Sequence, residues 1–341
     1  MSFTIQTEKK AVAQLDGTIY VLEDAASGAR AEIWPALGFN CFRWQAPWQG
    51  QAVDLLYADP ELFHNPVPTR SGIPILFPFP NRIRAGQFTW QGKDFTLPIN
   101  DPAKANAIHG FACRHPWRIV AQGTTDSEAW LQGEFSSERD AGEARALWPA
   151  AYRLRVTVRL SLERLRLVME VTNTSQAILP FGIGLHPYFS VPLVPGGTEA
   201  ECWVQIPAHT YWELEANLPT GNRQPVDEAH DLTRPRKISD LQLDDALSGL
   251  PGCGPGAIET LCLLGKLGQE TPAAELTVRA SPAFREVVVF NPPHRQAFCL
   301  EPYTCITDAI NLQRQGIDAG LLSLPPGQQW TGHVELTWHG G

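Results

Sequence analysis

The sequence predicts an all-β protein whose strands form a large antiparallel β-sandwich. Apolar and polar residues alternate with a period of two over much of the chain, a pattern that indicates strands with one buried face. The chain also contains 29 prolines and 28 glycines, and they separate short apolar segments as turns separate the strands of a sandwich. Segments with helical periodicity are scarce, so little helix is expected.

The N-terminal third contains the first predicted strands and a hairpin. Residues 19–22 and 31–34 are predicted strands, and residues 59–63 have room for one or two turns of helix. Residues 87–97 predict a hairpin, because alternating aromatic residues precede and follow a Gln-Gly pair that is typical of tight turns.

A second hairpin is predicted in the middle of the chain. Every second residue of the segment 152–162 is apolar, and the alternation resumes over residues 165–171 after a tight turn. The run PGG then predicts a loop over residues 194–199. Residues 202–206 are the next predicted strand.

The C-terminal third continues the pattern. Residues 247–258 (LSGLPGCGPGAI) are too rich in Gly and Pro for regular structure and are predicted to form a loop. Strands are predicted at residues 276–278, 286–290 and 333–338, and a short helix at residues 308–315.

Composition and charge exclude several classes of protein. The formal net charge is −9 at pH 7, whereas nucleic-acid binders usually carry a basic surface. No run of about 18 apolar residues is present, so no membrane span is expected. The N-terminal segment is polar and lacks the apolar stretch of a signal peptide, which predicts a cytoplasmic protein. Because candidate site residues lie on both sides of each predicted loop, a single domain over residues 1–341 is expected.

The seven cysteines are scattered and contain no C-x-x-C pair, which predicts reduced thiols and not a disulfide framework. They are Cys41, Cys113, Cys202, Cys253, Cys262, Cys299 and Cys305. Cys113 and Cys305 lie near candidate site segments, so a catalytic thiol is an alternative. Buried cysteine that serves as a small apolar residue is the favoured interpretation.

Three short segments, AIHGF, GLHPYF and LEPYT, place His109, His186 and Glu301 among Gly, Pro and aromatic residues. Two imidazoles and a carboxylate can give and take protons near neutral pH, as general acid–base catalysis requires. Glycine and aromatic neighbours suit a groove in which a sugar ring approaches the backbone and stacks on an apolar surface. These segments predict an enzyme that acts on carbohydrate.

Glu301 is the strongest of these signals. The preceding residues AFCL predict a buried strand, where a carboxylate is costly unless it is paired or functional. Taken alone, His109 is more typical of a surface histidine or a hydrogen-bonded core histidine. His186 fits a buried histidine bonded to a backbone carbonyl equally well.

Asn81 and Arg82 follow the proline-rich segment SGIPILFPFP, which is stiff enough to hold a cation in a fixed place. Arginine offers a planar set of donors for sugar hydroxyls or a carboxylate, and the Asn81 amide both donates and accepts. The alternative is a loop arginine on the surface. Asp244 and Asp245 in QLDDAL form a like-charge pair that is typical of a solvated turn. In the functional interpretation, one of them accepts hydrogen bonds from two neighbouring sugar hydroxyls.

A metal site at His109, Cys113 and His115, with Glu301 as a fourth ligand, is a further alternative. The run H-x-x-x-C-x-H has no partner cluster at the usual zinc spacing, so no metal is expected. The sequence also contains neither the G-x-S-x-G motif of serine hydrolases nor a phosphate-binding glycine loop.

In their order and separation, the segments FPNRI, AIHGF, GLHPYF, QLDDAL and LEPYT resemble the aldose 1-epimerases, also called galactose mutarotases. The resemblance extends over AEIWPALGFN and the closing segment LPPGQQWTGHVELTW, from about Ile19 to Trp338. It implies a β-sandwich of the galactose mutarotase type, a sugar bound in an open groove across one sheet, and no cofactor.

The resemblance also implies a role for each candidate residue. Glu301 matches the general base, His186 the general acid, and His109 the histidine that bonds the sugar near its ring oxygen. Arg82 and Asp244 match the substrate-binding arginine and aspartate, although QLDDAL offers a second aspartate. A hexose would then change anomer as the base takes the proton of the anomeric hydroxyl and the acid protonates the ring oxygen.

The run TRSGIPILFPF also resembles the related hexose-6-phosphate epimerases, so that activity is the alternative, with Arg70, Arg82 or Arg84 holding the phosphate. A catalytically silent sugar-binding protein is a third possibility, disfavoured because a binder needs no buried acid–base pair. The predicted substrate is a free hexose. The predicted partners are limited to this small-molecule sugar, with no nucleic acid and no membrane, and the chain is expected to be a monomer or a homodimer.

Overall fold

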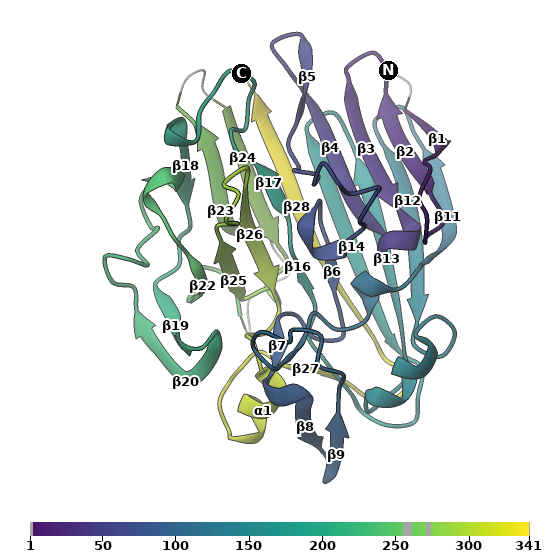
Figure 1. Ribbon diagram of the computed structural model, residues 1–341, viewed down its shortest axis with the longest axis vertical. Helices are drawn as coiled ribbons and strands as arrows, with labels where there is room; N and C mark the ends of the chain where they lie inside the picture. The colour runs from purple at the N-terminus through teal and green to yellow at the C-terminus, as the bar shows by residue number, and fades with distance from the viewer. Residues whose placement is uncertain (1–2, 255–260, 271–273, 341) are drawn as a thin grey trace.

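A computed structural model describes residues 3–254, 261–270 and 274–340 of the chain. The described residues form three larger sheets of five, eight and nine strands, in which neighbouring strands pair antiparallel (Figure 1). The predicted all-β sandwich is therefore confirmed. Within the described residues, no helix is long and apolar enough to cross a membrane.

The spatial order of the strands follows the chain in the five-stranded sheet and departs from it in the two others. The five-stranded sheet contains β1 (Thr4–Lys9), β2 (Thr18–Asp24), β3 (Ala29–Trp34), β4 (Asn40–Trp48) and β5 (Gln51–Asp54). Across the nine-stranded sheet, the order is β11 (Arg118–Thr124), β12 (Ala129–Ser136), β13 (Tyr152–Leu160), β14 (Arg164–Asn173), β28 (Gln329–Gly340), β24 (Ala274–Ala280), β23 (Cys262–Gln269), β18 (Cys202–Gln205) and β21 (Arg236–Lys237). Across the eight-stranded sheet, it is β20 (Leu218–Pro225), β19 (Thr210–Glu215), β22 (Asp244–Ser248), β25 (Glu286–Phe290), β26 (Ala297–Tyr303), β16 (Gly184–Leu185) and β6 (Ile75–Leu76), with β17 (Tyr188–Ser190) also paired to β26.

Smaller elements connect these sheets. Three two-stranded pairs are β7 (Arg82–Ile83) with β10 (Ala107–Ile108), β8 (Gln87–Trp90) with β9 (Lys93–Thr96), and β15 (Leu179–Phe181) with β27 (Leu322–Leu324). The helical elements are α1 (Ala309–Arg314) and the short 3-10 turns Pro35–Leu37, Pro68–Arg70, Arg84–Gly86, Ala112–Arg114, Gly142–Leu147, Glu199–Glu201 and Ile238–Asp240.

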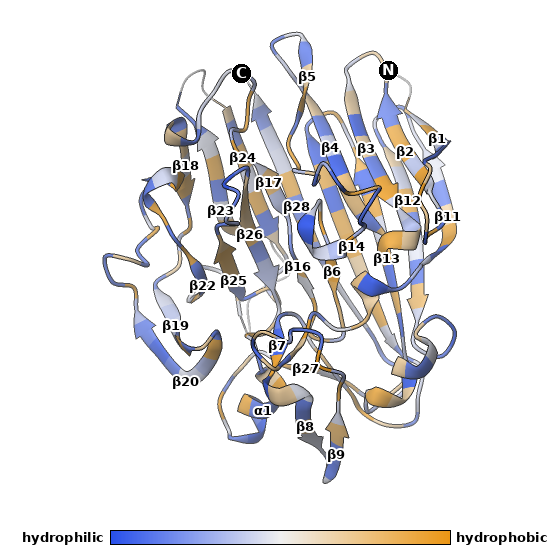
Figure 2. Ribbon diagram, in the orientation of Figure 1, coloured by the Kyte–Doolittle hydropathy of each residue, from blue (hydrophilic) through white to orange (hydrophobic). Residues whose placement is uncertain are grey.

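One continuous hydrophobic core lies between the nine-stranded sheet and the two other large sheets. It includes Ile33 of β3, Val156 of β13, and Val287 and Leu300 of the eight-stranded sheet. Figure 1 shows β2 to β4 lying over β12 to β14, and residues of β2 contact β12. Figure 2 shows hydrophobic and hydrophilic residues alternating along many of these strands, because such a strand turns one face to this core and the other away from it.

Most predicted elements are confirmed, with local differences in extent. Both hairpins form, as β8–β9 and β13–β14, and the predicted helix at 308–315 is α1. Residues 59–63 form a hydrogen-bonded turn, in which the Leu62 N–H donates to the Asp59 carbonyl, without a helix. The loop predicted at 247–258 begins later, because residues 247 and 248 extend β22. Residues 255–258 lie outside the described part of the chain.

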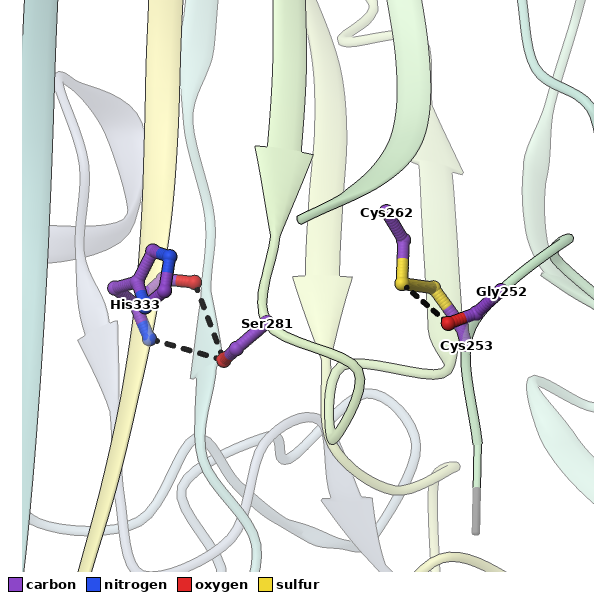
Figure 3. Close-up of a disulfide and its surroundings, with 5 residues drawn as sticks. All are labelled: Gly252, Cys253, Cys262, Ser281 and His333. Atoms are coloured by element: carbon purple, nitrogen blue, oxygen red, sulfur yellow. Dashed lines mark hydrogen bonds between the residues drawn. A yellow bond between two sulfur atoms is a disulfide. The ribbon is translucent and has the colours of Figure 1, made fainter. Parts of the chain in front are cut away.

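The prediction that all seven cysteines are reduced is wrong for one pair. Cys253 and Cys262 form a disulfide, with Cα atoms 5.9 Å apart, within the range that such a bridge spans (Figure 3). The search for C-x-x-C pairs did not predict this bridge, because the two cysteines are nine residues apart in the sequence. The other five cysteines are free and buried.

Candidate active site

Strand β26 carries the candidate site on the face that points away from the main core. Phe298 and Leu300 belong to that core, whereas Cys299 and Tyr303 belong to separate clusters on the other face of the sheet. Because side chains alternate along a strand, Glu301 shares the face of Cys299 and Tyr303. It is only 2% exposed. The carboxyl group of Glu301, which follows the apolar residues AFCL, is therefore directed away from the sandwich interior.

The register of the eight-stranded sheet brings Asp244 to the same face. Val288 of β25 pairs with Glu301, and Ala246 of β22 pairs with Val288. Asp244 lies two residues before Ala246, so its side chain shares that face. Asp244 and Asp245 both line a pocket together with Asn81 and Arg82, and the Asn217 amide donates to Asp244 Oδ2 at 2.8 Å.

His186 lies between β16 and β17, which both pair with β26. Its backbone N–H donates to the carbonyl of Pro74 at 3.0 Å. Its Nε2 lies 3.4 Å from Glu301 Oε1. The ring stacks on Tyr188, with centroids 4.6 Å apart, and the Tyr188 hydroxyl is held by a 2.6 Å hydrogen bond to the carbonyl of Thr69. The sequence-predicted histidine and glutamate are therefore in contact, although they are far apart in the chain.

His109 completes the same wall from a strained loop. It follows β10 with a left-handed backbone (φ 66°), and its N–H donates to the carbonyl of Asn81 at 2.8 Å. A Cβ on Gly110 would lie 2.2 Å from the carbonyl oxygen of Phe77, so only glycine fits at position 110. The rings of His109 and His186 are 5.6 Å apart.

Burial shifts the pKa of each group in this cluster toward its neutral form. Burial lowers the pKa of His186 to about 3 and that of His109 well below 6.5. Burial raises the pKa of Glu301 well above 4.5, although the Tyr303 hydroxyl donates a 2.5 Å hydrogen bond to its Oε2 and opposes that shift. Burial therefore favours the form of the His186–Glu301 pair in which both groups are neutral, with one proton on the carboxyl group.

Arg82 is held by acidic and amide neighbours beside this pair. Its Nε donates to Asp101 Oδ2 at 2.7 Å, and its Nη1 donates to Asn81 Oδ1 at 3.1 Å. Asn81 and Asp308 both have left-handed backbones, with φ of 53° and 59°. The Asp308 N–H donates to the Arg82 carbonyl at 2.8 Å, and its Oδ1 accepts the N–H of Arg84 at 3.1 Å. These contacts fix the backbone on both sides of Arg82.

Four further residues of the candidate site were not predicted from the sequence: Tyr188, Tyr303, Cys299 and Asp101. The first three had a usable signal. Tyr188 follows His186 by two residues, and Cys299 and Tyr303 flank Glu301 by two, so period-two alternation puts them on the same face. Asp101 had no such signal, because its contact with Arg82 is made across a loop.

The alternative metal cluster is not assembled. Cys113 Sγ donates to the carbonyl of His109 at 3.6 Å, and His115 Nδ1 lies 2.8 Å from the carbonyl of Phe111. Burial raises the pKa of Cys113 to about 11 and that of Cys305 to about 12, so both are protonated thiols at neutral pH. Neither is an activated nucleophile.

The chain resembles known proteins in both sequence and fold. The family model "Aldose 1-epimerase" matches residues 42–337. The uncharacterized protein YphB of Escherichia coli K12 is 26% identical over 264 residues, which cover 76% of this chain and 81% of YphB. A galactose mutarotase-like protein from Clostridium acetobutylicum has a TM-score of 0.87 at 22% identity and covers 100% of this chain and 99% of its own.

Galactose 1-epimerase from Lactobacillus acidophilus has a TM-score of 0.76 at 18% identity, with 99% of both chains covered. These two structures show that the fold is that of the galactose mutarotases. The family match extends over most of the chain and includes every candidate site residue. The chain belongs to the aldose 1-epimerase family.

Proposed function

We propose that this protein is an aldose 1-epimerase that interconverts the α and β anomers of a free hexose. The observation that carries the proposal is the contact of 3.4 Å between His186 Nε2 and Glu301 Oε1, two buried proton-carrying groups on the outer face of the eight-stranded sheet. A base and an acid at this separation can reach two oxygens of one sugar ring.

The mechanism needs only proton transfers. The single proton of the pair moves from Glu301 to His186, and the ionised Glu301 then takes the proton of the anomeric hydroxyl. His186 gives its proton to the ring oxygen as the bond from that oxygen to the anomeric carbon breaks. The open aldehyde rotates about its carbon–carbon bond, and ring closure with the two roles reversed gives the other anomer. Each transfer contributes about 10² to 10⁴ in rate.

The remaining residues are proposed to hold the sugar. His109, on the same wall as His186, donates to the sugar near its ring oxygen. Arg82, Asn81 and Asp244 bind hydroxyl groups from the pocket that they line. Asp244 is the favoured aspartate because it shares the face of Glu301 through the strand register.

The charges around the pocket favour a free sugar over its 6-phosphate. Arg82 is paired with Asp101 at 2.7 Å, and Arg84 Nε lies 3.6 Å from Asp308 Oδ2. Each of these guanidinium groups already has a carboxylate partner. Two further carboxylates, those of the QLDDAL aspartates, line the pocket and would repel a phosphate dianion.

Polarimetry tests this proposal. Freshly dissolved α-glucose and α-galactose, and their 6-phosphates, are followed with and without the enzyme. We expect faster relaxation of at least one free hexose, with a specificity constant well above that of the phosphate. A clear preference for a 6-phosphate would instead establish the hexose-6-phosphate epimerase. Sugar binding without faster anomer exchange would show that the chain is a catalytically silent sugar-binding protein.

A further inference from the structure

A third potential ligand group lies beside the proposed acid–base pair. Cys299 precedes Glu301 by two residues on β26 and is paired with Tyr188 of β17, whose ring stacks on His186. His186, Cys299 and Glu301 each offer one ligand atom, and these three atoms lie within 4.8 Å of one another. Among the described residues this is the group that brings imidazole, thiol and carboxylate together in this way.

The set of donor atoms has a definite chemical preference. One nitrogen, one sulfur and one carboxylate oxygen suit zinc and other soft divalent ions, whereas magnesium and calcium prefer oxygen alone. Zinc bonds of about 2.0–2.3 Å place tetrahedral ligand atoms about 3.3–3.8 Å apart. The distance of 3.4 Å between His186 Nε2 and Glu301 Oε1 lies in that range. The sulfur needs to move by no more than about 1 Å to complete the set.

We propose that His186 Nε2, Cys299 Sγ and Glu301 together bind a soft divalent cation, Zn²⁺ or Cd²⁺, and that the bound ion inhibits the enzyme reversibly. Cys299 loses its thiol proton and Glu301 its carboxyl proton to solvent when the metal binds, so that thiolate, carboxylate and neutral imidazole are the ligands. A water molecule takes the fourth position, as in zinc sites with three protein ligands.

Inhibition follows from the lone pairs that the ion occupies. The proposed reaction needs the lone pair of His186 Nε2 and the carboxylate of Glu301 to accept protons in turn. Both are used as ligands in the metal-bound form, so sugar and metal compete. This part of the inference rests on the proposed function, whereas metal binding itself does not.

Cadmium titration tests the site without any measurement of activity. A cadmium–thiolate bond absorbs in the ultraviolet, and we expect this band to saturate at one equivalent of Cd²⁺ per chain. The variants Cys299→Ser and Cys299→Ala should each lose the band. Loss of one direct ligand should weaken metal binding about 100-fold or more, since even outer-shell changes cost 10–100-fold.

A control variant tests whether the sulfur atoms of the disulfide bind the cadmium instead. The double variant C253S/C262S removes the pair that forms the disulfide, and it should keep the band unchanged. If the band survived in both Cys299 variants, or disappeared in the double variant alone, the site would be assigned wrongly.

Inhibition is measured separately by polarimetry with added Zn²⁺. We expect zinc to slow wild-type anomer exchange in competition with sugar, and a chelator to restore it. The turnover of Cys299→Ser, relative to its own metal-free rate, should need about 100-fold more zinc for the same inhibition. If Cd²⁺ binds at Cys299 but zinc leaves turnover unchanged, inhibition is disproved and the site stands. If no sugar is turned over, the proposed function fails, and the cadmium titration still decides the site.

Discussion

Two glutamates of this protein are almost equally buried and lie in opposite environments. Glu134 of β12 is 6% exposed and Glu301 of β26 is 2% exposed. Glu134 accepts hydrogen bonds from Arg155 at 2.7 Å and Arg118 at 2.9 Å. Glu301 has the neutral imidazole of His186 and the hydroxyl of Tyr303 as its neighbours.

The two carboxyl groups consequently titrate in opposite directions. Burial acts to raise the pKa of Glu134, but the hydrogen bonds from Arg155 and Arg118 outweigh it, and the net pKa lies below 4.5. Burial raises the pKa of Glu301 well above 4.5, and its hydrogen bond from Tyr303 does not compensate. Burial raises the pKa of both carboxyl groups, and the hydrogen-bond partners decide whether that increase remains.

The largest expected effect is on turnover. Glu301→Gln keeps the shape of the side chain and removes its basicity, so anomer exchange should fall at least 10²-fold by polarimetry. Glu134→Gln is the matched control and should keep turnover within about twofold, because Glu134 lies outside the proposed site. Glu301→Gln turnover above about a tenth of the wild-type rate would contradict the base role and abolish the contrast between the two glutamates.

A smaller change is expected from Tyr303→Phe, which removes the only hydroxyl that donates to Glu301 in the described part of the chain. The variant should lose roughly tenfold in turnover, since a hydrogen bond to a charged group contributes about 1.5–3 kcal/mol, only part of which is specific to the transition state. That hydrogen bond lowers the pKa of Glu301, so its loss should raise this pKa further.

The pH profile of kcat/KM separates this effect from simple loss of packing. In the proposed mechanism the His186–Glu301 pair carries one proton, and at high pH it would lose that proton. The alkaline limb of the profile should therefore move to higher pH in Tyr303→Phe. An unchanged limb, or one that moves to lower pH, would show that Tyr303 does not act through Glu301.

The contributions of the two glutamates to the free energy of unfolding should change with pH in opposite directions. The folded protein binds the Glu301 proton more tightly than the unfolded chain, so this stabilisation is complete below about pH 4.5 and is lost as pH rises through the higher folded pKa. The amide of Glu301→Gln does not titrate. The free energy of unfolding of this variant should therefore exceed that of the wild type at pH 8 and equal it near pH 4.

For Glu134 the folded pKa is lowered, so its stabilisation is present above about pH 4.5 and is lost as pH falls through the folded pKa. Glu134→Gln should therefore lose about 1–2 kcal/mol at pH 8, and this loss should shrink in acid. Urea unfolding of both variants at several pH values measures these differences. Parallel pH trends for the two variants would contradict the comparison.

The smallest expected effect is that of chelation. The proposed reaction moves protons between side chains and sugar oxygens, so treatment with a strong chelator should leave turnover at or slightly above its starting value. Polarimetry before and after chelation measures this. Loss of activity that added zinc restores would show that the metal is required, and it would overturn both the metal-free mechanism and the inhibitory role of the ion.

The fold was largely predictable because period-two alternation is a local property. The alternation at 152–162 matches most of the burial pattern of β13, and the apolar segment 286–290 forms β25, which is buried over nearly its whole length. The contact of His186 with Glu301 depends on the pairing of β16 and β17 with β26. Residue types suggested this contact, but no local pattern could place the two side chains 3.4 Å apart.

Two features had no local signal at all. Asp101 pairs with Arg82 across a loop, and no periodicity connects a loop residue to its partner. The disulfide joins Cys253 and Cys262, which are nine residues apart in a part of the sequence that is rich in Gly and Pro. Such stretches allow many backbone paths, and the spacing of two cysteines does not choose among them.

Three of the left-handed residues beside the site, Asn81, His109 and Asp308, lead to a conflict between heat tolerance and activity. Each adopts a backbone that favours glycine, at a cost of about 1–2 kcal/mol compared with an unstrained position. Glycine at any of the three would relieve that strain and remove a side chain that the wall or its backbone needs. A selection for heat resistance alone should therefore enrich glycine at position 109, where a selection for turnover would restore histidine, whereas both selections should keep Asp308, whose carboxylate accepts the N–H of Arg84.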